Sequence, residues 1–380
     1  MLLSSARSLR TVDTFLVLIF SREYILHLEG LRLIENPELL TGIVLHGAHG
    51  IYEVHTDSGI IRCTLRGKLK KAFARAQAAT RSKGRPRASV NVYQLLREER
   101  EQSKRSKSEE SGPTSPTRIS VGDYVKLRRL DEQNGLIEEI LPRQSELSRK
   151  DAGSTAEKIV PQTLLANLDQ VVIVLAVAQP EPHFGFLDRY LAICEATRLQ
   201  ALICLNKADL PHASAIEEAA EQYRKLGYTL IFTSAHTGEG IEELRAHLKE
   251  HTTLFTGPSG VGKSSLVNAL EPGMDIRTSE VSEATGKGRH TTTGSRLYPL
   301  SGGGWLADSA GIRALAAWNI PAEELAWCFV EFRPYLGECL YNDCTHINEE
   351  GCAILQAVED GVVAESRHKS YVRMYMGEER

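Results

Sequence analysis

The sequence has no long apolar run of the kind that crosses a membrane. The apolar run near its start, Thr14 to Ser21, spans eight residues, whereas a membrane-spanning helix needs about 20. Because Arg7 and Arg10 precede this run, it shares features with a secretory signal and, in a Ser- and Arg-rich context, with an organelle transit peptide. We interpret residues 1–40 as a simple N-terminal extension and expect no membrane partner.

Cysteine is too scarce for a disulfide scaffold. There are seven cysteines in 380 residues, and three of them, Cys339, Cys344 and Cys352, lie in one short stretch. This pattern favours a reducing compartment and a bound metal. A chain of this length suits two or three domains, each large enough to bury a core of its own.

The sequence also lacks a strong net charge, but its charges are unevenly distributed. The whole chain carries −4, whereas residues 66–107 contain fourteen Lys and Arg against three Glu, a net charge of +11. Overlapping this stretch, residues 72–118 form a Ser-, Arg-, Lys- and Pro-rich insertion. A basic block can bind a polyanion by releasing counterions, or it can be a solvated, disordered linker.

Short, alternating apolar runs flank the basic insertion. They occupy residues 42–71 and 119–141 and are punctuated by glycines, as in small antiparallel β structures. Asn134-Gly135 predicts a hairpin turn, since both residues tolerate positive φ. We expect one OB-type β-barrel over residues 41–149. Small five-stranded barrels commonly bind nucleic acid, which favours RNA as the polyanion.

From about residue 160 the pattern changes to apolar strands that alternate with helices. Strands are predicted at residues 171–177, 201–205, 229–233 and 252–256. This alternation is typical of an α/β domain with a mostly parallel, buried sheet. We place this domain at residues 150–318 and a helical domain at residues 319–380.

A phosphate-binding loop follows the predicted strand at residues 252–256 and precedes a helix, the context that such a loop requires. Its glycines allow successive backbone N–H groups to point at phosphates, Lys263 would contact the β and γ oxygens, and Ser264 would ligate Mg²⁺. The predicted nucleotide ligands are Gly257, Pro258, Ser259, Gly260, Val261, Gly262, Lys263, Ser264 and Ser265.

A second motif, Asn206, Lys207, Ala208 and Asp209, follows the predicted strand at residues 201–205. It would lie at the carboxyl edge of the sheet, where open α/β folds bind ligands. The Asp209 carboxylate can accept hydrogen bonds from guanine N1–H and N2, a donor pair that adenine lacks. Asn206 would tie neighbouring loops together. Ser234 and Ala235 end the next strand, so the Ala235 N–H could contact guanine O6.

Two further segments resemble GTPase switches. The first contains His290 and Thr292, and the second contains Asp308 and Gly311. We expect Thr292 to complete the Mg²⁺ shell, Asp308 to hold the metal through water, and the Gly311 N–H to sense the γ-phosphate. Ile312 follows this glycine, where many GTPases have a water-orienting glutamine. His290 is the alternative candidate for that catalytic role, and intrinsic hydrolysis should be slow.

The cysteine-rich stretch has the pattern of a structural metal site. Cys339, Cys344, His346 and Cys352 lie within 14 positions and offer three thiolates and one imidazole. This set suits one tetrahedral zinc ion without an open coordination position. The alternative is a group of buried free cysteines, but the neighbouring Asn, Asp, Thr and Glu residues make it less favoured.

The guanine motif precedes the phosphate loop, which reverses the usual order, so the GTPase domain is circularly permuted. With the barrel before it and the cysteine cluster after it, the chain resembles the RsgA family, also called YjeQ or EngC. The resemblance covers residues 42–374, apart from the basic insertion, and includes Gly288–Thr293 and the second switch, which has alanine where proline commonly precedes the glycine.

The resemblance implies a GTPase that binds the small ribosomal subunit and its 16S-type rRNA late in assembly. It also implies hydrolysis of GTP to GDP that the subunit stimulates, in a monomer with Mg²⁺ and zinc. A cytoplasmic location is expected, or the plastid stroma if residues 1–40 are a transit peptide. The alternatives from other classes are a P-loop kinase and an RNA-binding scaffold that holds GTP without efficient hydrolysis.

Overall fold

The computed structural model describes residues 39–67, 69–71, 118–150, 161–272, 274, 296–307 and 320–378. His290, Thr292, Asp308 and Gly311 lie outside these ranges, as do most of the basic insertion and the apolar run at residues 14–21. Within the described ranges, no helix combines the length and apolarity that a membrane crossing requires.

Five strands close into a barrel, as the sequence predicts. They are β1 (Leu39–Ala48), β2 (Ile51–Thr56), β3 (Gly59–Leu65), β4 (Tyr124–Arg129) and β5 (Asn134–Ile140), in the order β1-β2-β3-β5-β4. Alternate residues of β3 are buried because successive side chains of a strand point to opposite faces. Closure leaves no unpaired edge.

The prediction of a turn at Asn134-Gly135 is wrong. Both residues belong to β5 and pair with Arg62 and Cys63 of β3. The chain reverses earlier, where the Asp131 carboxylate accepts hydrogen bonds from the backbone N–H groups of Gln133 and Asn134, both at 2.8 Å. Gly135 instead allows close packing, since a Cβ there would lie 2.9 Å from Cys63 Sγ.

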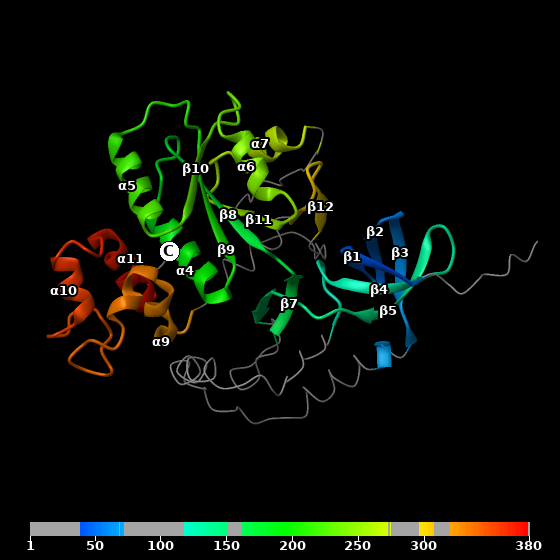
Figure 1. Cartoon of the computed structure of the whole chain (residues 1–380), viewed down its shortest axis with the longest axis horizontal. Coiled ribbons are helices and arrows are strands. Elements are labelled where there is room, and N and C mark those ends of the chain that lie inside the picture. The colour runs from blue at the N-terminus through cyan, green and yellow to red at the C-terminus, as the bar shows by residue number, and fades with distance from the viewer. Residues whose placement is uncertain are drawn as a thin grey trace, which may run out of the picture. The chain divides into compact units, whose positions relative to one another are not determined.

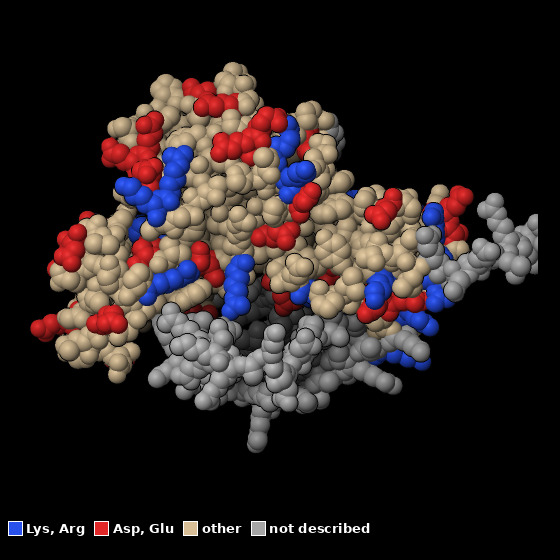
Figure 2. All heavy atoms as spheres, viewed as in Figure 1, with Lys and Arg blue, Asp and Glu red and all other residues tan. Residues whose placement is uncertain are grey.

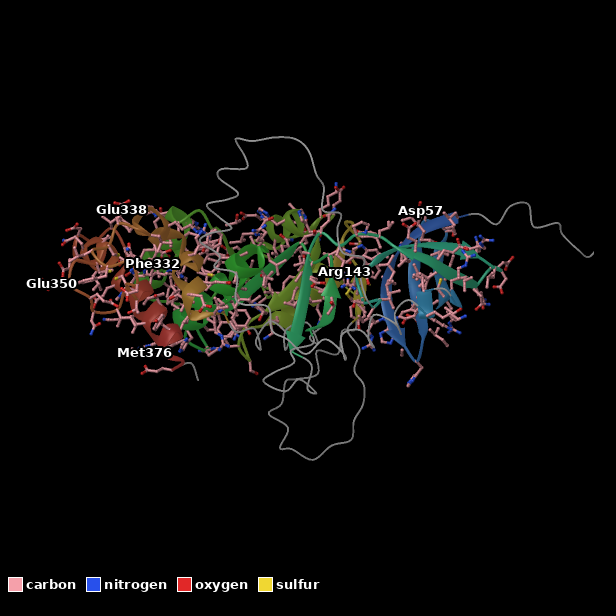
Figure 3. The ribbon with its side chains drawn as sticks, turned by 90° about the horizontal axis from the view of Figure 1, so that it is seen from below. Asp57, Arg143, Phe332, Glu338, Glu350 and Met376 are labelled. Atoms are coloured by element: carbon pink, nitrogen blue, oxygen red, sulfur yellow. The ribbon has the colours of Figure 1, made fainter. Side chains whose placement is uncertain are left out.

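The barrel is joined to the next domain through a two-stranded hairpin, β6 (Glu146–Lys150) and β7 (Pro161–Ala166). Arg143, just before β6, donates from Nε to Asp123 Oδ1 at 2.7 Å and from Nη1 to Thr163 Oγ1 at 3.0 Å (Figure 3). Burial alone would lower the pKa of Arg143, but the hydrogen bond and charge of Asp123 raise it. A charged, buried pair therefore holds this junction.

The central domain is a six-stranded sheet in the order β10-β9-β8-β11-β13-β12, in which β12 is antiparallel to β13 and the others are parallel. The parallel order and the predicted strand positions agree with the sequence analysis. The strands are β8 (Gln170–Ala176), β9 (Gln200–Asn206), β10 (Thr229–Thr233), β11 (Thr252–Thr256), β12 (Leu297–Pro299) and β13 (Trp305–Ala307).

Helices cover both faces of this sheet (Figure 1). Every residue of β8 is buried. Val171, Ile173 and Leu175 belong to one core with helices α4 and α5, whereas Val172 and Val174 belong to a second core with α6 and α7. A strand buried on both faces explains the continuous apolar run in the sequence. The helices are α4 (Phe184–Thr197), α5 (Ser214–Lys225), α6 (Ile241–Leu248) and α7 (Lys263–Leu270).

The C-terminal domain is built from short helices around an aromatic core. Phe329, Phe332 and Tyr371 are buried there, with the ring centroids of Phe332 and Tyr371 5.2 Å apart. The core also includes Ala192 of α4, so the domain packs on the central one. Its elements are α9 (Ala322–Leu325), the 3₁₀ helices η1 (Ala326–Cys328) and η2 (Val330–Tyr335), α10 (Ala353–Glu359) and α11 (Glu365–Met376).

Candidate nucleotide-binding site and metal centre

The predicted nucleotide-binding motifs meet at one edge of the central sheet. Strand β9 ends at Asn206, and its neighbour β10 ends at Thr233, which is paired with Asn206. On the other side, β8 separates β9 from β11, which ends at Thr256. Because these strands are parallel, the loops that follow them lie together. The structure thus brings together segments that are 20 to 50 positions apart in the sequence.

Asn206 connects the loops. Its side chain is buried, its Nδ2 donates to the Val261 carbonyl at 2.8 Å, and its Oδ1 accepts from Thr233 Oγ1 at 3.2 Å. Its own carbonyl accepts from the Val177 N–H at 2.9 Å. One amide side chain therefore joins the phosphate loop to the end of β10, a role in which both halves of the amide group are used.

Asp209 lies beside the end of β10, as a guanine acceptor would. Ser234 Oγ donates to Asp209 Oδ1 at 2.6 Å, and this hydrogen bond lowers the pKa of the carboxyl group, with burial opposing it and the charges of His236 and Lys207 assisting. The carboxylate is therefore ionised and able to accept. Ala208 donates its N–H to the Thr233 carbonyl at 3.0 Å, which sets the turn that presents Asp209.

Two glycines of the phosphate loop adopt conformations that side chains would block. Gly257 has a φ of 152° and Gly262 has a φ of 92°. A Cβ on Gly257 would lie 2.2 Å from the Val174 carbonyl oxygen, and one on Gly262 would lie 2.4 Å from Asn206 Nδ2. The loop can follow its path past β8 and Asn206 only because these positions carry no side chain.

Lys263 begins α7 and bends back over the loop. Its Nζ donates to the carbonyls of Gly257 at 2.8 Å and Pro258 at 2.7 Å, and burial lowers the pKa of its ammonium group. An ammonium held over the loop can bind phosphate oxygens. Ser264 and Ser265 lie in the first turn of α7, and the N-terminus of a helix favours an anion. Ser264 is a predicted Mg²⁺ ligand, and Thr292, the other predicted ligand, lies outside the described residues.

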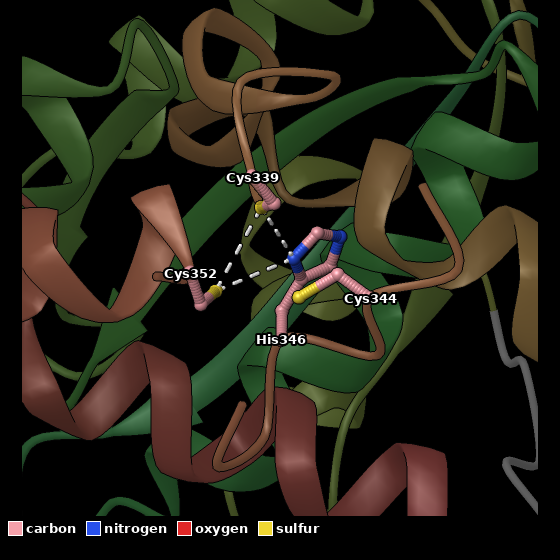
Figure 4. A group of neighbouring side chains, drawn as sticks. All are labelled: Cys339, Cys344, His346 and Cys352. Carbon is pink, nitrogen blue, oxygen red and sulfur yellow. Dashed lines mark hydrogen bonds between the residues drawn. The ribbon is translucent and has the colours of Figure 1, made fainter. Parts of the chain in front are cut away.

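The four predicted zinc ligands converge in the C-terminal domain. Their ligand atoms all lie within 4.8 Å of one another (Figure 4). His346 Nδ1 is 3.5 Å from the sulfurs of Cys339 and Cys352, which are 3.9 Å apart. Zn–S and Zn–N bonds of about 2.3 and 2.0 Å in a tetrahedron place the ligand atoms about 3.5–3.8 Å apart, so the residues fit a zinc ion.

The surroundings of the cluster orient its ligands. The Thr345 carbonyl accepts from the Tyr371 hydroxyl, and the His346 carbonyl contacts His368 Nε2, both at 2.8 Å. Burial lowers the pKa of His346, which favours the neutral imidazole that a metal requires. The Glu349 carboxylate accepts hydrogen bonds from the backbone N–H groups of Thr345 and Ile347. Burial alone would raise the pKa of Glu349, but these bonds and the one from the Thr345 hydroxyl lower it to about 2.

A buried ion-pair network, which the sequence does not reveal, joins the C-terminal domain to α4. Arg367 of α11 donates from Nη1 to Asp188 of α4 at 2.7 Å and from Nε to Glu331 of η2 at 2.6 Å. Tyr223 of α5 also donates to Asp188, at 2.7 Å. Burial alone would lower the pKa of Arg367, but the charges of Asp188 and Glu331 raise it. The guanidinium therefore stays charged between two carboxylates.

Replacing Arg367 with methionine should strongly destabilise the chain, because it leaves Asp188 and Glu331 buried without their counter-charge. Loss of one partner of a buried pair costs about 3–5 kcal/mol. The midpoint of the first transition in urea measures this loss. Lys369→Met is the control, since Lys369 lies on the same helix with its side chain exposed. Equal midpoints for the two variants would contradict a structural role of the network.

Comparisons with known proteins agree with this architecture. The family model of the RsgA GTPase matches residues 140–318. The small ribosomal subunit biogenesis GTPase RsgA of Gemmatimonas aurantiaca is 41% identical over 341 residues, which cover 88% of this chain and 96% of that protein.

Two solved structures have a similar fold over nearly their whole length. YjeQ from Thermotoga maritima has a TM-score of 0.63 and 30% identity, and covers 90% of this chain and 98% of its own. YloQ, described as a circularly permuted GTPase, has a TM-score of 0.62 and 27% identity, and covers 91% and 97%.

Proposed function

This chain belongs to the RsgA family of GTPases, and on that premise we propose that it binds the small ribosomal subunit and assists its late maturation. GTP hydrolysis to GDP would be stimulated by the subunit. The observation that carries the GTPase function is that Asn206 connects two loops. One contains the predicted guanine acceptor Asp209, and the other is the phosphate loop that leads to Lys263. A P-loop kinase would have no use for a guanine acceptor, and the comparisons favour neither that alternative nor a non-hydrolysing scaffold.

We assign nucleotide binding to residues Asn206–Asp209, Ser234, Ala235 and Gly257–Ser265. Mg²⁺ would bind with GTP at Ser264 and Thr292, and one structural zinc at Cys339, Cys344, His346 and Cys352. Zinc would supply structural cross-linking alone, because all four positions of its tetrahedron are filled by protein atoms. His290, Asp308 and Gly311 keep their proposed catalytic roles as predictions.

The barrel supplies the proposed contact with 16S-type rRNA. Lys and Arg side chains lie on the barrel, among Asp and Glu side chains, on the face shown in Figure 2. Arg62 of β3 is exposed, and Lys126 and Arg128 of β4 are about two-fifths exposed, each paired with a glutamate of β5. Cations on a small barrel can bind a phosphate backbone. As a partner of the ribosomal subunit, the chain would act in the cytoplasm as a monomer.

Co-sedimentation with purified ribosomal subunits tests the proposed partner. We expect the protein with a non-hydrolysable GTP analogue to pellet with small subunits but not with large ones, and to be released by salt. Arg62→Ala should weaken binding and lower the slope of log affinity against log salt by about one. Lys249→Ala, which removes an exposed cation of the central domain, is the control. Equal pelleting with both subunits would refute the assignment.

A further inference from the structure

Strand β2 of the barrel contacts the hairpin β12–β13 at the residue before β12 and at the first residue of β13. Arg296, the residue before β12, donates from Nη2 to Glu53 Oε2 at 2.7 Å. The rings of His55 and Trp305 meet edge to face, with centroids 5.0 Å apart. Glu53 and His55 are two positions apart on one strand, so they lie on the same face of β2. This face therefore holds the residue before β12 through an ion pair and β13 through a ring contact.

The contacted hairpin lies between the two predicted switches. Arg296 follows Thr292 by four positions, and Trp305 precedes Asp308 by three. Strand β13 also pairs with β11, where Ala307 lies opposite Leu254. Leu254 is two residues before the end of β11, and β11 leads into the phosphate loop. A displacement of this hairpin would therefore change where both switch segments begin or end relative to the bound phosphates.

The barrel is fastened independently at another place, so it cannot simply follow the hairpin. The Ala166 N–H donates to the Val121 carbonyl, and Asn167 Nδ2 donates to the Gly122 carbonyl, both at 2.8 Å. The Arg143 pair with Asp123 reinforces this junction. Because the barrel has two separate attachments to the central domain, movement of β12–β13 must strain the β2 contacts or turn the barrel.

We propose that Glu53 and His55 are positioning residues for GTP hydrolysis, which link the RNA-binding barrel to the strands that carry the switches. This inference rests on the proposed function. When RNA phosphates bind the barrel cations, β2 holds Arg296 and Trp305, and thereby the ends of both switches, in the hydrolysing arrangement. Because coupling between two binding sites is reciprocal, the nucleotide that is bound should in turn act on β2 through the same contacts.

Hydrogen exchange tests this coupling without any ribosomal subunit. In the full chain, the backbone amides of β2 are expected to exchange at different rates with a non-hydrolysable GTP analogue and with GDP. Glu53→Gln should reduce the difference, whereas Asp57→Asn, which removes an exposed carboxylate from the turn after β2, should preserve it. Exchange at β2 that is identical in both nucleotide states would overturn the proposal.

Turnover with small subunits tests the effect on hydrolysis. Glu53→Gln should lower the stimulated kcat about tenfold, a size typical of residues that couple sites, while KM for GTP and subunit affinity stay unchanged. The exchanged pair Glu53→Arg with Arg296→Glu should recover most of the rate. A stimulated kcat equal to that of the unmodified chain would overturn the proposal. If the unmodified chain is not stimulated but β2 exchange depends on nucleotide, the ribosomal function fails and the coupling stands.

Discussion

Replacing Asp209 with asparagine is expected to lower the affinity for GTP by about 10⁴, since a site built to hydrogen-bond a ligand discriminates by about this factor when the pairing is lost. The Asp209 carboxylate accepts from Ser234 through Oδ1 and can accept from guanine with its remaining lone pairs. An asparagine amide presents a donor where guanine also presents one. Xanthine carries an oxygen in place of the guanine N2 amine, so the variant should gain affinity for xanthosine triphosphate.

Competition binding with the four common nucleoside triphosphates and xanthosine triphosphate measures this change. Glu239→Gln is the matched control, because Glu239 is an exposed carboxylate in the loop after β10, and its variant should keep the preference for GTP. The guanine assignment is wrong if Asp209→Asn binds GTP as tightly as the unmodified chain does.

Removal of zinc is expected to unfold the C-terminal domain. Structural zinc supplies about 10–16 kcal/mol of apparent binding free energy in zinc-finger peptides. Here Cys352 also accepts from the Leu355 N–H at 3.5 Å at the start of α10, and the backbone of the metal loop is bound by His368 and Tyr371 of α11. Without metal, α10 and α11 would lose their common attachment, and with it the aromatic core around Phe332.

The measurement combines metal analysis with hydrogen exchange over residues 320–378. The unmodified chain should contain one zinc per molecule, and a chelator or Cys344→Ser should remove both the metal and the protection of these amides. Cys328→Ala is the control, since Cys328 is buried in the same core but lies outside the cluster. Full protection of the domain in metal-free protein would show that zinc has no structural role.

Local sequence patterns predicted the strands and the metal cluster well. Strands β10 and β11 begin and end at the predicted residues, because a buried parallel strand is continuously apolar and turn residues bound it. The four predicted metal ligands lie close together in sequence, and the structure brings their ligand atoms within 4.8 Å of one another. The same reasoning failed at Asn134-Gly135, where packing against Cys63 rather than a turn requires the glycine.

Contacts between distant segments left no comparable signal. Arg367 is 179 positions from Asp188, and nothing in the composition of either helix distinguishes this arginine from a solvated one. Glu53 and Arg296 are 243 positions apart and are likewise ordinary charged residues in their local context. Such pairs depend on how the domains pack, which periodicity and spacing do not encode.

The central claim is that this GTPase acts on the small ribosomal subunit, and multiple-turnover GTP hydrolysis tests it most directly. Phosphate release should be slow for the chain alone, since Ile312 stands where a water-orienting glutamine is common. Purified small subunits should raise the rate by at least about tenfold through groups that they supply or order, whereas large subunits should not. A rate that is the same with and without small subunits would contradict the account.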